Sequence, residues 1–339
     1  MPAFAKEKFR RNDFAHEVLN SYGRRNMDSL LRIFPQKRRA FWQKTADNGG
    51  KICEIRLRVD RPVIVETSRG DYFLNNGGEW QEHPYGAHLV TEAEIRELIA
   101  WLCQDSVYAY ADEIRQGFLT VEGGHRIGLC GQAVLENETV IRTLKNIAFI
   151  NIRVAHEIRG AADGILPKLY KKGKFQNTLI VSPPGFGKTT LLRDLIRQIS
   201  DGNTYGAGLR VGVVDERSEL AGSYLGRPQN DLGMRTDILD NCPKAEGMMM
   251  LVRSMAPEVI AADEIGTAKD VEAIEYAMHC GATMLTTVHG SGMDEIREKP
   301  LVSNLVKERC FARYVVMKSG KHVGEIEGIY NERGEKLCI

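Results

Sequence analysis

The stretch NTLIVSPPGFGKTTLLRDLIRQIS, residues 177–200, decides the fold of this chain. It begins with a short apolar run rich in β-branched residues, Thr178–Val181, and continues through a Pro/Gly segment, Ser182–Gly187. From Lys188 to Ser200 the apolar residues then recur at helical spacing. A strand, a glycine loop and a helix, with Gly-Lys-Thr at the junction, form the layout of a phosphate-binding P-loop.

The chemistry of phosphate binding explains these residue types. Gly185 and Gly187 allow backbone N–H groups to turn inward around phosphate oxygens, and the helix that follows points its positive end at them. Lys188 can reach the β- and γ-phosphates, and the Thr189 hydroxyl can hold Mg²⁺, so we expect ATP and Mg²⁺ as ligands. The residues predicted to hold the nucleotide are Ser182, Pro183, Pro184, Gly185, Phe186, Gly187, Lys188, Thr189 and Thr190.

One position departs from the P-loop pattern G-x-x-x-x-G-K-[ST], because the chain has Ser182 where the pattern has its first glycine. This position lies at the end of the strand, before the phosphate cradle. A small residue is therefore compatible with the motif there.

The length of 339 residues favours two domains, and 43% apolar with 27% charged residues is typical of a soluble globular protein. A net charge of +1 gives no overall electrostatic reason to expect nucleic acid or a membrane as partner. The seven cysteines form no C-x-x-C motif, which indicates reduced thiols and no zinc site. Without a long apolar run or a secretory signal, a cytoplasmic location is expected.

We predict three regions. Residues 1–45 form a basic amphipathic helical segment, because residues 1–40 hold ten Lys or Arg against four Asp or Glu. Its basic face is either solvated or meets an anionic surface, a membrane or a partner protein. Residues 46–160 form a smaller α+β domain with a capping box at Thr91 and a hairpin around residues 123–124. Residues 161–339 form the P-loop domain.

In the P-loop domain, strands alternate with helices, which predicts an α/β architecture with a parallel sheet. The predicted strands are Thr178–Val181, Leu209–Asp215, Glu258–Asp263 and Thr283–Val288, with closing strands at Arg313–Lys318 and Val323–Tyr330. The predicted helices are 188–200, 243–255 and 269–279.

A P-loop needs an acidic strand end beside it, and two strands offer one. Asp215 ends the strand that follows the P-loop helix, and Asp263-Glu264 ends a later strand. In P-loop ATPases with a catalytic glutamate, one strand lies between the P-loop strand and the Mg²⁺ strand in sequence. We therefore assign Asp263 to Mg²⁺, through water, and Glu264 to polarising the attacking water.

Two further groups fall at the same sheet edge. His289 ends the next strand, at the carboxyl edge where such sheets place their ligands, so we expect a sensing or positioning role. Asp215–Glu219 ends its own strand on that edge, where it is either an outer contact of the metal site or a helix cap.

Several segments of the sequence resemble known protein families. Val252–Gly290 is similar to the second half of the type II/IV secretion and pilus-retraction ATPases. The segments SPPGFGKTTLLRD, VGVVDERSEL, PQNDLGMRTDILDNCPKAEGMMMLVRSM, EIRLRVDRPV and GHRIGLCGQAV more closely resemble the stage III sporulation AA family. The resemblance runs from about residue 50 to residue 290.

This resemblance implies a RecA-like ATPase core, a hexameric ring, and integral membrane partners in a channel or secretion complex of endospore formation. It implies a place in the mother-cell cytoplasm, at the inner face of the membrane. The catalytic set it implies is Lys188, the Walker B residue Glu264 and the His-box residue His289. The acid of its Asp box corresponds to Asp215 or Glu216.

The family also clamps nucleotide with arginines of the N-terminal domain, which implies a role for Arg153 and, more weakly, Arg142. Arg217 and Arg235 are candidates for contacts across a subunit boundary. Secretion ATPases often have an arginine two residues after the Walker B glutamate, where this chain has Gly266. The coupling contacts of that arginine are therefore not expected here.

The sequence thus predicts an ATP-hydrolysing motor that powers assembly of, or transport through, a membrane channel. A nucleic-acid-stimulated motor is the first alternative, and the near-zero charge with no interleaving of basic and aromatic residues argues against it. A nucleotide-switched scaffold with little turnover is the second, and the intact Glu264 argues against it.

Overall fold

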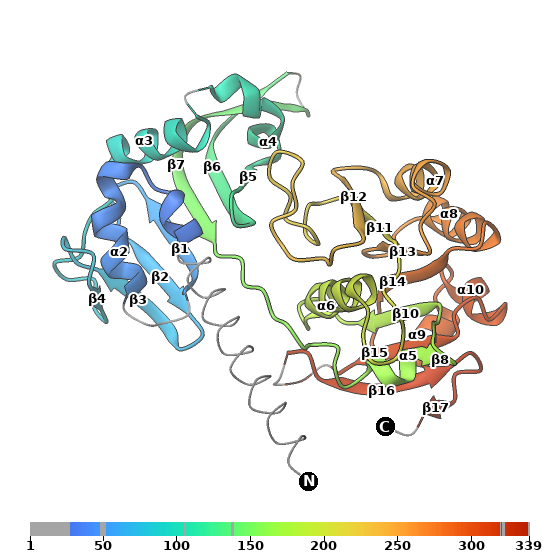
Figure 1. Cartoon of the computed structure of the whole chain (residues 1–339). Coiled ribbons are helices and arrows are strands. Elements are labelled where there is room, and N and C mark those ends of the chain that lie inside the picture. The colour runs from blue at the N-terminus through green and yellow to red at the C-terminus, as the bar shows by residue number, and fades with distance from the viewer. Residues whose placement is uncertain are drawn as a thin grey trace, which may run out of the picture. The chain divides into compact units, whose positions relative to one another are not determined.

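The computed structural model describes residues 28–47, 52–104, 106–136, 139–318, 320 and 323–337. The chain divides into two compact units, Met1–His156 and Glu157–Ile339 (Figure 1). The boundary lies four residues before the predicted start of the P-loop domain. Among the described residues, no helix is both long enough and apolar enough to cross a membrane.

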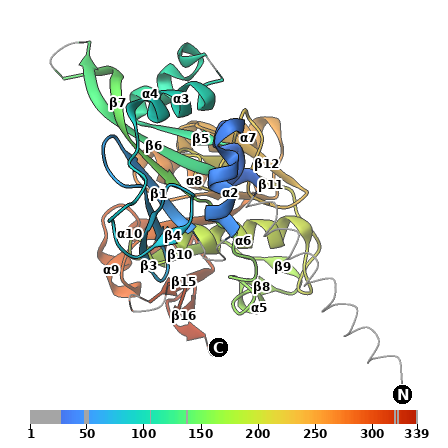
Figure 2. The same cartoon turned by 90° about the vertical axis from the view of Figure 1, so that its left-hand side faces the viewer.

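Unit 1 is built on a seven-stranded antiparallel sheet in the order β4-β3-β2-β1-β7-β6-β5, with α2, α3 and α4 beside it (Figure 2). The predicted capping box is present, since Thr91 and Glu94 bond each other's backbone at the start of α3. Helix α4 ends at Gly117, which has a left-handed φ of 82° that favours glycine. The elements are β1 Ile52–Arg58, β2 Ile64–Thr67, β3 Gly70–Leu74, β4 Trp80–Gln81, β5 Phe118–Val121, β6 His125–Leu135, β7 Ile141–Arg153, α2 Arg39–Asp47, α3 Glu92–Leu102 and α4 Ala111–Gln116, with 3₁₀ turns η1 Gln36–Arg38 and η2 Val107–Tyr110.

Residues 28–47 correct the prediction of a separate segment over residues 1–45. Leu30, Phe34 and Trp42 are buried in the core of unit 1, and the rings of Phe34 and Trp42 stack with centroids 3.9 Å apart. Three of its basic side chains, Arg32, Lys37 and Arg38, pair with acids of the same unit. The stretch is therefore a built-in part of the domain. Residues 1–27 lie outside the described part of the chain.

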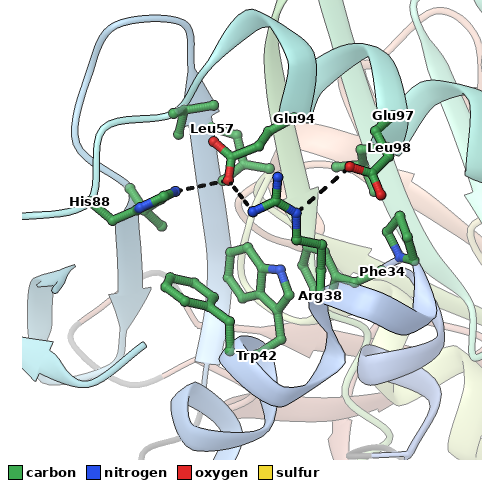
Figure 3. Close-up of a pocket in the computed structure, with 12 residues that line it drawn as sticks. Phe34, Arg38, Trp42, Leu57, His88, Glu94, Glu97 and Leu98 are labelled. Carbon is green, nitrogen blue, oxygen red and sulfur yellow. Dashed lines mark hydrogen bonds and ion pairs between the residues drawn. The ribbon is translucent and has the colours of Figure 1, made fainter. Parts of the chain in front are cut away.

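Arg38 closes a small cavity between this stretch and α3 (Figure 3). Its guanidinium lies 2.9 Å from Glu94 and 3.7 Å from Glu97, and His88 Nε2 lies 3.0 Å from Glu94. Burial raises the pKa of Glu94, but the Thr91 N–H and the charges of His88 and Arg38 outweigh it, so the net pKa lies below its ordinary value. The cavity holds about 50 Å³, far below the size of a small-molecule site.

Unit 2 is built on an eight-stranded sheet in the order β12-β11-β13-β14-β10-β15-β16-β17. The first six strands are parallel, and β16 and β17 are antiparallel. The elements are β8 Tyr170–Lys171, β9 Lys174–Phe175, β10 Thr178–Ser182, β11 Val211–Asp215, β12 Thr236–Asp240, β13 Val259–Ala262, β14 Thr283–His289, β15 Arg313–Met317, β16 Ile326–Asn331, β17 Lys336–Leu337, α5 Leu166–Leu169, α6 Lys188–Asp201, α7 Lys244–Ser254, α8 Ala268–His279, α9 Met293–Glu298 and α10 Ser303–Lys307.

Both faces of this sheet are covered, which explains why its strands are apolar almost throughout. Ile180 belongs to the core cluster that contains the buried side of α6. Its neighbours Leu179 and Val181 belong to the cluster formed with α7 and α8. A parallel strand buried on both faces reads as a continuous apolar run, as β10 does. The predicted parallel α/β sheet is confirmed.

The sequence did not predict β12, a half-exposed edge strand in which only Ile238 and Leu239 are apolar. Nor did it predict the short helices α9 and α10. Edge elements of this kind bury too little apolar surface to produce a clear hydrophobic period.

We predict that Glu94→Ala lowers the free energy of unfolding of unit 1 by about 1–3 kcal/mol, because a helix cap and two ionic partners are lost. The folded pKa is below the unfolded one, so this stability is present near neutral pH and disappears as the pH falls below about 4. Urea unfolding of the full chain, followed by tryptophan fluorescence, measures it, since all three tryptophans lie in unit 1.

Glu92→Ala is the matched control, because this exposed glutamate on the same helix forms a solvent-exposed ion pair with Arg96. Its effect should be about 0.5 kcal/mol or less. Equal losses in the two variants, or a Glu94→Ala loss that does not depend on pH, would contradict the role of the Glu94 network.

Candidate nucleotide-binding site

The P-loop has the geometry that phosphate binding requires. Strand β10 ends at Ser182 and α6 begins at Lys188, with Gly185 and Gly187 at left-handed φ values of 81° and 89°. A Cβ on Gly187 would make a tight contact, 3.1 Å from Cγ1 of the exposed Val323, so the left-handed φ is the main reason for glycine here. No side chain caps the first turn of α6, so the N–H groups of that turn are available to bind an anion.

The Ser182 side chain, at the position of the missing glycine, does not point into the phosphate-binding loop. It is fully buried, and its hydroxyl donates to the carbonyl of Pro183 at 2.9 Å. Its position at the strand end agrees with the prediction that a small residue is compatible there.

The predicted acids come to the P-loop because three parallel strands are aligned. β10 lies beside β14, with Ser182 paired to His289, and β14 lies beside β13, with Ala262 paired to Thr286. The residues that follow β13 therefore reach the same edge of the sheet as the loop. Lys188 Nζ lies 3.5 Å from Asp263 Oδ1 and 3.7 Å from Glu264 Oε2.

Two threonines of β14 orient Asp263. The Thr287 hydroxyl donates to Asp263 Oδ1 at 3.1 Å, and the Thr286 hydroxyl donates to the Asp263 carbonyl at 3.2 Å. Sequence reasoning missed both residues. The available signal was a pair of hydroxyl residues inside an otherwise apolar strand two residues before His289.

His289 connects the P-loop strand to Glu264. Its Nε2 lies 2.9 Å from Glu264 Oε2, and its Nδ1 lies 3.3 Å from the carbonyl oxygen of Ser182. A carbonyl oxygen can only accept, so Nδ1 carries a proton. Nε2 is the nitrogen that faces the Glu264 carboxylate. Lys299 fixes the backbone here by donating to the His289 carbonyl at 2.7 Å.

The turn after Glu264 is held by the capping box of α8. The Asp270 carboxylate accepts from the N–H groups of Gly266 and Thr267 at 3.0 and 2.9 Å, and the Thr267 hydroxyl accepts from the Asp270 N–H. Asp270 is only 5% exposed. This local brace sets the direction in which Glu264 leaves the sheet.

Asp215 anchors a loop and caps no helix. Its buried carboxylate accepts from the N–H groups of Glu219, Leu220 and Ala221 at 2.7–2.9 Å, and residues 216–235 contain no helix. Burial raises the pKa of Asp215 to about 6 in spite of these donors. The predicted helix cap is therefore wrong, and the carboxylate is occupied by backbone.

These residues line one cavity of about 470 Å³, a size that suits a small-molecule ligand. The cavity is lined by Pro184, Gly185, Gly187, Lys188, Thr189, Thr190, Asp215, Glu216, Arg217, Glu219, Lys244, Asp263, Glu264, Gly266 and His289. In the described residues no group of three or more His, Cys, Asp or Glu side chains could hold a metal alone. The hydroxyl of Thr189 and the carboxylate of Asp263 are oxygen donors that fit Mg²⁺ carried on phosphates, and their predicted metal contacts stay a prediction.

The candidate arginines are placed differently. Arg153 lies on β7 of unit 1, 3.3 Å from Glu54, so its predicted nucleotide contact stays a prediction. Arg217 lines the cavity. Arg235 donates to the carbonyl of Ser200 at 3.0 Å, at the end of α6 remote from Lys188.

The parallel sheet, with the P-loop at its carboxyl edge, defines a RecA-like fold, which solved secretion ATPases share. The Yersinia pseudotuberculosis ATPase DotB is similar with a TM-score of 0.56 and 13% identity, over 88% of this chain and 80% of that one. The pilus retraction motor PilT, solved with bound ADP, is similar with a TM-score of 0.53 and 13% identity, over 82% of this chain and 76% of that one.

The chain belongs to the family described as Sporulation stage III, protein AA, whose profile matches residues 24–337. Stage III sporulation protein AA of Bacillus subtilis (strain 168) is 38% identical over 312 residues, which is 92% of this chain and 97% of that protein.

We predict that Asp215→Ala exposes the amides of Glu219, Leu220 and Ala221 to solvent, with exchange at least about tenfold faster, because three charge-assisted hydrogen bonds are lost. Hydrogen exchange with mass spectrometry on the full chain measures it. Asp237→Asn, at an exposed carboxylate on β12, is the control and should leave these amides protected. Unchanged exchange in Asp215→Ala would contradict the anchoring role.

Proposed function

We propose that this chain is a Mg²⁺-dependent ATPase that converts ATP hydrolysis into mechanical work during endospore formation. The observation that carries the proposal is the contact of Lys188 with both Asp263 and Glu264 inside a cavity of nucleotide size. A lysine from the P-loop and two acids from a separate strand are the groups that phosphoryl transfer to water uses.

Each residue then has a defined task. The P-loop amides and Lys188 bind the phosphates, and Lys188 exchanges its carboxylate partners for phosphate oxygens as ATP enters. Thr189 and Asp263 would hold Mg²⁺, which offsets the charge of the phosphates. Release from Lys188 leaves Glu264 free to orient and polarise the attacking water.

His289 makes hydrolysis sensitive to the loop that binds the substrate. Because its two ring nitrogens contact the Ser182 carbonyl and Glu264, a shift of the P-loop strand end changes the position of the Glu264 carboxylate. The His289 contact thus helps to position Glu264 as water is activated.

We further propose that the motor is a hexameric ring that acts on integral membrane proteins of a channel or secretion complex, from the mother-cell cytoplasm at the inner face of the membrane. The secretion-ATPase fold and the sporulation family support this. A ring provides the neighbouring subunit that Arg217 would need in order to act across a boundary.

We predict that Lys188→Ala abolishes ATP binding, whereas Glu264→Gln keeps ATP binding and loses at least about 100-fold in turnover. The first removes a phosphate contact and the second removes the group that activates water. Glu272→Gln is the control, since Glu272 is exposed on α8, and it should turn over ATP at the wild-type rate. Phosphate release and titration calorimetry measure the two effects, and wild-type turnover in both site variants would refute the proposal.

We also predict that ATP and Mg²⁺ shift the Glu264→Gln chain to about six times its 38.0 kDa mass, because a variant that cannot hydrolyse ATP holds the ring in its loaded state. Multi-angle light scattering with and without ATP–Mg²⁺ measures the mass. A single-chain mass under both conditions, at concentrations that saturate the site, would contradict the ring.

A further inference from the structure

A second lysine lines the nucleotide cavity, and neither the P-loop pattern nor the family resemblance assigns it a role. Lys244 is the first residue of α7, and its side chain is only 17% exposed. It contributes to the same cavity as Lys188 and forms an ion pair with Glu216, directly after β11. We propose that Lys244 is a phosphate-contacting residue that reads the terminal phosphate of ATP and releases Glu216 when it does so.

The order of the strands explains how Lys244 reaches this site. β12 and β11 extend the same parallel sheet beyond β13, with Asp240 paired to Asp215. The carboxyl ends of all these strands therefore lie on the edge that holds the P-loop. Because α7 follows β12 after only three residues, its first residue is at this edge as well.

The position of Lys244 is unfavourable for the helix itself. A helix start has a positive end, and a cation in the first turn is repelled by it. The lysine thus does not stabilise α7 by its charge. Together with the amide end of α7, it concentrates positive potential on the wall of a cavity that binds an anion.

The charge balance of the cavity favours an exchange of partners. Its lining carries five acids, Asp215, Glu216, Glu219, Asp263 and Glu264, against the cations Lys188, Arg217 and Lys244. Lys188 contacts Asp263 and Glu264, and Lys244 contacts Glu216. The phosphates of ATP can therefore bind Lys188 or Lys244 only if that lysine first leaves its carboxylate partner.

The freed acids then have tasks of their own. Asp263 turns to the metal and Glu264 to water, as proposed above. Glu216, 42% exposed in its pair, moves toward solvent or Arg217. Lys244 thereby couples the arrival of the phosphate chain to the loop that follows Asp215. The inference rests on the proposed nucleotide site and adds a discriminating contact to it.

The test is equilibrium binding of ATP and of ADP to the full chain, by titration calorimetry in EDTA and again with Mg²⁺. Lys244→Ala should weaken ATP by about tenfold to a hundredfold, the usual effect of losing one charge-assisted hydrogen bond. ADP should weaken by less than about threefold, because it lacks the terminal phosphate. Lys244→Arg should restore most of the ATP affinity, whereas Lys244→Gln, which keeps the stem, should not.

Glu216→Gln distinguishes two roles of Lys244: contact with phosphate, and support of α7 through its ion pair with Glu216. If Lys244 binds phosphate, removing its competing carboxylate strengthens ATP binding in EDTA or leaves it equal. If the ion pair only braces α7 against β11, both variants weaken ATP and ADP by similar factors, and that result overturns the inference. Lys171→Ala, which removes one exposed positive charge from the same unit on β8, is the control for net charge and should bind as the wild type does.

Two failures can be told apart. ATP binding that Lys188→Ala abolishes and Lys244→Ala leaves unchanged overturns the role of Lys244 alone. Absence of ATP binding in the wild-type chain overturns the nucleotide site and this inference together. Thermal unfolding of each variant confirms that it is folded before its affinity is compared.

Discussion

The register of three neighbouring parallel strands is the constraint on which this site depends. β10 and β14 end side by side at Ser182 and His289, and β13 ends at Ala262 beside Thr286. The P-loop, His289 and the Asp263-Glu264 pair therefore leave the sheet at one edge. Side chains alternate between the two faces of a strand, so a slip of one residue would turn each of these groups the other way. The buried apolar residues on both faces of β10 hold that register.

The contacts at this edge of the sheet form a continuous chain from the P-loop to Glu264. The Ser182 carbonyl contacts His289, His289 contacts Glu264, and Glu264 contacts Lys188, which returns to the loop. Because each of these residues contacts the next, they cannot move independently. A ligand that draws Lys188 toward phosphate therefore also changes the contacts of Glu264. In the proposed mechanism this couples ATP binding to hydrolysis within a single subunit.

Local patterns predicted the parts of the site that are encoded locally. The P-loop is a contiguous motif, and Asp263-Glu264 and His289 stand where apolar strands end. Thr287 and Lys244 were not predicted, because their importance depends on which strand lies beside which. Asp215 was located correctly, but its partners lie four to six residues further along an irregular loop, and no hydrophobic period predicts such a loop.

In the N-terminal region, the sequence prediction was wrong for residues 28–47. Its charge suggested a separate basic segment, yet Phe34 and Trp42 belong to the core of unit 1, and Arg38 is matched by acids on α3. Charge counts describe a surface, whereas spacing of a few large apolar residues decides whether a stretch joins a domain.

The most direct test of the account is a crystal structure of the chain with Mg²⁺ and a non-hydrolysable ATP analogue. We expect the triphosphate on the loop from Gly185 to Lys188, the metal beside Thr189 and Asp263, and Glu264 released from Lys188. A nucleotide bound elsewhere, or a bound triphosphate with Lys188 still paired to both acids, would contradict it.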